Sequence, residues 1–336
     1  ADWDNIRAAV IQALDGEDLA SAARLVVATA RFATFEVHHE HRDWGQRTRD
    51  LAERIGQIPP PAVFGFQAWW LGTLGQQAEA GRLATGGIDA ATSPTESSTA
   101  SCWYARCLFD ANMDDIDPLI DRHGAAAAAG DIIDRNNNAW LQVLAGERLA
   151  RSDPAAGIRR AARGVELMEE LANGSSHAAA WAWLELARGQ LAAMAQEYTG
   201  ALEHFNAALE HARRAHHPIM FASTSVYLAG TLRLRGGPID AAEYLRALDL
   251  VERHGAFEAQ IIGYVASHLL SAGGLEPATT LIAYLEASGV QSIEAGWSWP
   301  EKPDHPQAER WWSRGAALSL EQAIEYAREA LRALTT

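Results

Sequence analysis

The sequence contains very little cysteine and no long apolar run. Only two of its 336 residues are cysteines, Cys102 and Cys107, in the helix-like stretch SCWYARCLF. Five residues correspond to about 140° around a helix, so a disulfide between them is not expected. Two buried, reduced thiols are typical of a reducing compartment. Since no apolar run of about 18 residues and no secretory signal pattern occur, we expect no membrane-spanning helix and a cytoplasmic location.

Positive charge is also scarce. The formal net charge is −15 and the sequence pI is about 5.2. The basic residues are almost all arginine, with Lys302 as the single lysine. Nucleic-acid-binding modules carry a basic surface that neutralises phosphates, and this composition argues against one. The sequence therefore predicts no direct nucleic acid contact and points to proteins or small molecules as partners.

The common catalytic and cofactor motifs are missing. The sequence has no GxxxxGK[ST] phosphate loop, no GxGxxG after a strand, no GxSxG, no HExxH and no CxxC. These patterns place the groups that ATP hydrolysis, dinucleotide binding, serine hydrolysis and zinc chemistry require. We therefore expect a non-enzymatic chain without a cofactor.

What the sequence does contain is helical periodicity along almost its whole length. Apolar residues recur at helical spacing, and short breakers such as IPPPA, SDPAAG, RGGP and SAGG separate the segments. The pattern predicts an all-α fold, an array of α-hairpins. The expected helices cover residues 3–15, 18–36, 41–56, 62–81, 99–111, 115–129, 131–150, 154–172, 176–195, 198–215, 219–235, 238–254, 257–273, 275–288 and 319–333.

Several residues of this array repeat in a way that resembles tetratricopeptide (TPR) repeats. Gly189, Ala201, Phe205 and Ala208 match the spacing of the TPR positions eight, twenty, twenty-four and twenty-seven. A second unit aligns 40 residues later, with Ala229, Ala241, Leu245 and Leu248. Small residues at such positions let helices approach closely, which favours a TPR-like, right-handed α-solenoid. Independent helix bundles are the alternative.

Breaks in the pattern suggest four regions. Residues 1–83 form N-terminal hairpins, and 84–98 have the composition of a linker loop. Residues 99–288 form the TPR-like repeats, and 289–336 hold an irregular, tryptophan-rich segment and a terminal helix. The irregular stretch, 289–318, is expected to cap the open end of the solenoid, or else to carry a function.

The most suggestive polar stretch is DRNNNAWL. Asparagine is a poor residue for a helix interior, yet Asn136, Asn137 and Asn138 lie in an expected first helix of a hairpin. Their amides can grip a peptide backbone, and Arg135 can bind a carboxylate. We predict a ligand- or partner-binding site here, together with Trp140. The alternatives are a solvent-exposed polar face and amides that bond within their own repeat.

Tryptophan pairs and a histidine cluster supply the other candidates. Adjacent tryptophans cannot share one core stripe, so Trp69, Trp70, Trp181 and Trp183 are further candidates for ligand binding, with helix packing as the alternative. In VHHEH, His38 and His41 share a helix face and are weak candidates for a metal site. A solvated helix end explains that cluster equally well, so no metal is predicted.

The two ends of the chain carry a family resemblance. Residues 4–9 read DNIRAA, a helix with Gly16, Glu17, Ala22 and Leu25 follows, and the C-terminal region reads WWSRGAALSLEQAIEYAREAL. These segments resemble the helical-repeat region of actinobacterial signal-transduction ATPases of the STAND class, which include LuxR-type, SARP-type and cyclase-linked regulators. The resemblance implies a sensor that binds an inducer or a protein and controls an upstream ATPase domain. It also implies that the chain is a portion of a longer regulator, and it assigns no binding residues.

Three functions thus stand side by side. The first is a non-enzymatic sensor or protein-interaction domain of a transcriptional or signalling regulator. The second is a stand-alone small-molecule binder with a tryptophan-lined pocket. The third is an enzyme with a His/Asp site that the motifs do not reveal.

Overall fold

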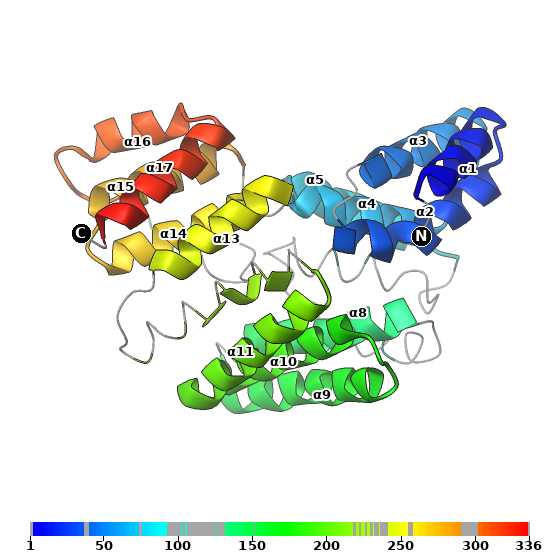
Figure 1. Cartoon of the computed structure of the whole chain (residues 1–336). Helices are drawn as coiled ribbons and strands as arrows, with labels where there is room; N and C mark the ends of the chain where they lie inside the picture. Colours follow the sequence, from blue (N-terminus) through cyan, green and yellow to red (C-terminus); the bar gives the residue numbers. More distant parts are fainter. Residues whose placement is uncertain are drawn as a thin grey trace. The chain divides into compact units, whose positions relative to one another are not determined.

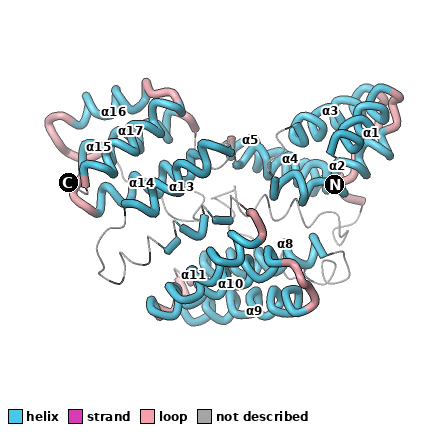
Figure 2. The backbone as a smooth tube through the Cα atoms, viewed as in Figure 1, coloured by secondary structure: helices cyan, strands magenta, loops and turns pink. Residues whose placement is uncertain are grey.

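The computed structural model describes residues 3–36, 40–73, 76–92, 132–150, 152–217, 241–254, 258–289 and 302–334, and isolated positions between them. In these ranges all regular structure is helical, as the sequence predicted, and Figures 1 and 2 show the helices and their connections. The helices are α1 (Trp3–Asp15), α2 (Leu19–Glu36), α3 (Glu40–Arg54), α4 (Pro61–Thr73), α5 (Gln77–Asp89), α8 (Ile132–Leu149), α9 (Pro154–Asn173), α10 (Ala178–Met194), α11 (Tyr198–Arg214), α13 (Ala241–His254), α14 (Glu258–Ser271), α15 (Leu275–Ala287), α16 (Ala308–Ala316) and α17 (Leu320–Ala333).

The chain forms two compact units, one of residues 1–72 and 78–141 and one of residues 73–77 and 142–336. The division falls within α8, not at the predicted linker. Helix α5 in fact continues into that linker as far as Asp89. Gly87 explains the difference, because a Cβ there would lie 2.6 Å from both Phe64 Cβ and Cys102 Sγ. A glycine that suggests a loop in the sequence is here a point of close helix packing.

A second departure from the sequence prediction is α16, which lies in the segment expected to be irregular. Ala308, Trp311 and Gly315 are buried at spacings of three and four residues. Gly315 lies so close to the carbonyl of Thr280 on α15 that a Cβ would overlap it. The apolar stripe of α16 therefore packs on α15, a distant partner that local composition does not reveal.

The same tight turn joins three of the helix pairs. It has three residues, and the middle one has positive φ: Glu17 between α1 and α2, Gln196 between α10 and α11, and Gly273 between α14 and α15. In each turn the next amide N–H donates to a carbonyl five residues back at 2.8 Å, which satisfies the end of the first helix. Two of the three positive-φ residues are not glycine, so composition alone does not mark these turns.

The residues that follow this turn also occupy equivalent positions. Three residues into each second helix stands a fully buried alanine: Ala22, Ala201 and Ala278. Four residues later comes a buried larger side chain: Val26, Phe205 and Ile282. Phe205 packs directly against Gly189 on the first helix, where a Cβ would overlap its ring. A single hairpin design therefore recurs, which places α1, α10 and α14 as first helices and α2, α11 and α15 as second helices.

Candidate functional site

The predicted polar stretch on α8 is mostly buried. Arg135 is exposed and Asn136 half-buried, whereas Asn137, Asn138 and Trp140 are buried. The expectation of an open polar surface is therefore wrong for these two asparagines and for Trp140. Among the described residues, Asn138 Oδ1 is buried and has no hydrogen-bond partner. Such a group destabilises the free protein by about 1–3 kcal/mol.

Two glutamines that the sequence analysis did not single out share this property. The side-chain oxygens of Gln142 on α8 and Gln190 on α10 are buried and lack a hydrogen-bond donor among the described residues. The two residues are only 8% and 4% exposed. The remaining unpartnered oxygens of this kind belong to Thr224, Ser225 and Ser267. Among the described residues, these six oxygens lie on α8, α10, α14 and the segment before α13, and none of them lies on α9, α11, α13 or α15.

An internal repeat connects α8 with α10 and was present in the sequence. AWLQ at 139–142 returns as AWLE at 182–185, and Gly146 returns as Gly189, in each case 43 residues later. Gly146 packs as closely as Gly189 does, since a Cβ there would lie 2.6 Å from the backbone nitrogen of Ala161 on α9. The pair α8–α9 is thus a further hairpin of related design, with α8 as its first helix.

Glu185, the repeat equivalent of Gln142, is the centre of an ionic cluster that we call the Glu185 cluster. Its Oε2 lies 2.7 Å from His204 Nδ1 on α11, and its Oε1 accepts from Arg188 Nη1 at 2.8 Å. Arg188 also binds Glu169 on α9 at 3.0 Å. The cluster therefore connects three consecutive helices.

The Glu185–His204 contact is the only feature of the described residues that resembles the predicted His/Asp chemistry. A carboxylate on Nδ1 orients an imidazole so that Nε2 can accept a proton, as general bases require. Here, however, Arg188 shares the same carboxylate, and all three side chains join neighbouring helices. This arrangement fits a role in holding α9, α10 and α11 together.

The tryptophan candidates of this region contact histidines. The Trp181 ring stacks on His211 with centroids 6.3 Å apart, and Trp183 meets His217 edge to face at 5.9 Å. Both tryptophans are half-buried. Since neither ring is fully covered, they stay candidates for contact with a ligand.

The remaining tryptophan candidates lie in the N-terminal unit, around His41. Trp70 is fully buried and donates its indole N–H to His41 Nδ1 at 3.1 Å, whereas Trp69 is half-buried. His41 Nε2 lies 2.7 Å from the carbonyl oxygen of Val26. With Nδ1 accepting, Nε2 is the protonated nitrogen, and the neutral ring joins α2, α3 and α4.

These contacts also show whether the candidate metal ligand His41 can bind a metal. Both nitrogens of His41 are occupied, so this side chain has no lone pair free for a metal, and His38 lies outside the described residues. The neighbouring Glu40 binds Arg7 in a bidentate pair at 2.7 and 2.8 Å and also accepts from the Trp3 indole. Within the described ranges, no three His, Cys, Asp or Glu side chains gather as a metal site would require.

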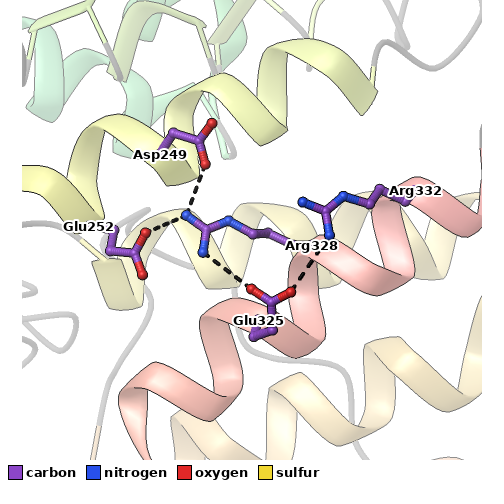
Figure 3. A network of polar contacts seen from close by, with 5 residues as sticks. All are labelled: Asp249, Glu252, Glu325, Arg328 and Arg332. Carbon is purple, nitrogen blue, oxygen red and sulfur yellow. Dashed lines mark hydrogen bonds and ion pairs between the residues drawn. The ribbon is translucent and has the colours of Figure 1, made fainter.

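The C-terminal helices contain a second ionic cluster, centred on Arg328 of α17, which sequence reasoning missed (Figure 3). Arg328 Nη2 binds Asp249 at 2.9 Å and Glu252 at 2.5 Å, both on α13, and Nη1 lies 3.4 Å from Glu325. Arg332 also approaches Glu325, at 3.6 Å. The pairing raises the pKa of the Arg328 guanidinium and lowers that of Glu252. No local signal indicates this cluster, because its partners are 79 and 76 residues away in sequence.

The pKa of Glu258, at the start of α14, is shifted in the opposite direction to that of Glu252. It is buried, and burial raises the pKa of its carboxyl to about 6, with the negative charge of Glu252 adding to the effect. Folding therefore makes the ionised form of this side chain less favourable than it is in water.

Comparison with known proteins adds no identification. The chain matches no protein-family model, and no curated protein is significantly similar to it.

None of the helices in the described ranges combines the length and apolar character that a membrane span needs.

Proposed function

We propose that this chain is a non-enzymatic, TPR-like helical-repeat module that binds a segment of a partner protein along α8 and α10. The observation that carries the proposal is the recurring hairpin: the same turn and the same buried positions in α1–α2, α10–α11 and α14–α15. Stacked hairpins of this kind form extended binding surfaces lined by equivalent helices.

The distribution of unpaired polar groups supports this choice. Buried amides without partners are rare in folded proteins, because each one costs stability. Here the side-chain oxygens of Gln142 on α8 and Gln190 on α10 are buried without a hydrogen-bond donor among the described residues. A peptide main chain offers donors and acceptors in alternation, and amide side chains can match both.

The family resemblance gives this binding a role. As the sensor of a STAND-class transcriptional or signalling regulator, the array would change the state of an upstream ATPase domain. A partner that prefers one curvature of the array shifts the populations of its states, and the neighbouring domain responds to that shift. The effect is limited by the difference in affinity between the states.

A random dodecapeptide library displayed on phage tests the proposal. We expect the full chain to enrich a set of related peptides. We expect the double variant Gln142→Leu/Gln190→Leu to bind these peptides at least tenfold more weakly. Glu203→Leu, an exposed change on the second helix α11, is the matched control and should bind as the original chain does.

No enrichment from the library would contradict the proposal. The half-buried Trp181 and Trp183 favour a second candidate, a binder of small molecules. That candidate predicts a thermal shift and a change in tryptophan fluorescence with metabolite pools, and no enrichment of peptides.

A further inference from the structure

The C-terminal helix α17 packs across the preceding hairpins. It contacts α13, α14 and α15, whereas α16 packs on α15 (Figure 1). Its buried apolar residues are Ala323, Ile324, Ala327 and Leu331, which join the core cluster around α14. The half-buried Tyr326 and Ala330 also pack against this cluster, so α17 has an apolar contact with it.

Charge adds a second component to the α17 contact. Arg328 is only 9% exposed and stands between Ala327 and Leu331 on the buried side of the helix. Its partners on α13, Asp249 and Glu252, stay largely open to solvent, with side chains 61% and 45% exposed. Two accessible carboxylates can exchange the guanidinium for water or for another cation, and salt weakens the contact.

Helix α17 also carries its own start signal. Ser319 and Gln322 form a capping box, in which each side chain bonds the other residue's backbone N–H. Within the helix, Glu325 pairs with Arg328 and Arg332. These local contacts favour the helical form of this segment without the help of α13.

We propose that α17 is a displaceable helical ligand in cis, seated on α13 and α14 through Arg328, and that a partner helix with the same alanine-rich stripe and a matching arginine takes its place. The acidic pair Asp249 and Glu252 selects for the arginine. Displacement uncovers α14, a first helix of the array. This inference does not depend on peptide binding at α8 and α10, so either proposal can fail alone.

The test uses the full chain and a fluorescein-labelled peptide of residues 318–336. In the unaltered chain α17 occupies its own seat, so we expect weak peptide binding. In Arg328→Gln we expect α17 to detach and to leave its binding surface on α13 and α14 free. We therefore expect at least a tenfold gain in peptide affinity. Hydrogen exchange should rise at least tenfold in α14 and α17 and stay unchanged in α9–α11.

The control is Arg332→Gln, which alters an exposed arginine of the same helix and should behave like the unaltered chain. The peptide carrying the R328Q change should bind the opened chain at least tenfold more weakly than the original peptide. A second variant, Asp249→Asn/Glu252→Gln, removes the acidic seat and keeps Arg328. It should raise exchange in α14 and α17 but should not bind the peptide.

Three results would overturn the inference. The first is unchanged exchange in α14 and α17 in both variants. The second is a rise in exchange in all helices from α9 to α17, in both variants. That result would mean that Arg328 stabilises all of these helices together and does not act on the α17 contact alone. The third is peptide binding that is equal in all chains.

Discussion

The Glu185 and Arg328 clusters both join helices through ion pairs, but the charge at the centre of each cluster has the opposite sign. In α9–α11 one carboxylate binds an arginine and a histidine, and the helices it joins are consecutive in sequence. In the C-terminal helices a single guanidinium gathers three carboxylates, and it joins α17 to a helix 76 to 79 residues earlier. The first cluster joins neighbouring helices, and the second joins α17 to the distant helix α13.

The largest expected effect comes from breaking the hairpin that carries the Glu185 cluster. Gly189→Val places a branched side chain where Phe205 lies, and we expect a loss of about 3 kcal/mol in the free energy of unfolding, from overpacking. Urea unfolding measures it. Gly200→Ala on α11 is the matched control, since its Cβ meets nothing within 4 Å and should be neutral or stabilising. Equal effects at both positions would contradict the packing described here.

Removing the centre of the C-terminal cluster should have the next largest effect. Arg328→Ala leaves Asp249, Glu252 and Glu325 close together without their shared cation. We expect a loss of about 2–3 kcal/mol, measured by urea unfolding at low salt and smaller at 1 M NaCl. Arg332→Ala should cost less than about 0.5 kcal/mol, because its side chain and its ion pair with Glu325 are exposed. Similar losses in the two variants would show that Arg328 is not the centre.

A gain in stability is expected from Glu258→Gln. The folded state holds the Glu258 proton with a pKa of about 6, above the ordinary 4.5, so the original chain loses stability as the pH rises through this interval. At pH 8 the buried carboxylate is charged, and the glutamine variant should be more stable by about 1–2 kcal/mol. At pH 4 the carboxyl is protonated in both states and the gain should vanish. Thermal unfolding at the two pH values measures this difference, and a gain independent of pH would contradict it.

The smallest expected effect comes from removing the carboxylate of the first cluster. After Glu185→Ala, Arg188 keeps Glu169, and His204 turns to solvent. We therefore expect a loss of only about 1 kcal/mol in urea unfolding. A loss larger than that of Arg328→Ala would reverse the comparison between the clusters. Glu203→Ala, exposed on the same helix as His204, is the control and should be neutral.

The features that the sequence revealed are those set by neighbours along the chain. Helical periodicity predicted the helices of α9–α11, and the spacing of Gly189, Ala201 and Phe205 predicted a contact that the structure contains. The AWLQ/AWLE repeat was equally visible and would have pointed to Gln142 and Glu185.

The features that the sequence did not reveal depend on distant partners. Gly87 and Gly315 read as loop residues until Phe64 and Thr280 are placed against them. Asn137 and Asn138 read as surface residues because polarity predicts exposure only on average. Arg328 is one of many arginines until the fold brings α13 beside it. In each case the deciding contact is set by packing between helices, and no local pattern encodes it.

Equilibrium urea unfolding of the double variant Gln142→Leu/Gln190→Leu, compared with the original chain without any ligand, tests whether α8 and α10 keep unpaired hydrogen-bonding groups in the free protein. If both amide oxygens are unpaired, their removal raises the unfolding midpoint with an unchanged m value. A lower midpoint would mean that these oxygens already have partners in the free fold, and it would contradict the binding role assigned to them.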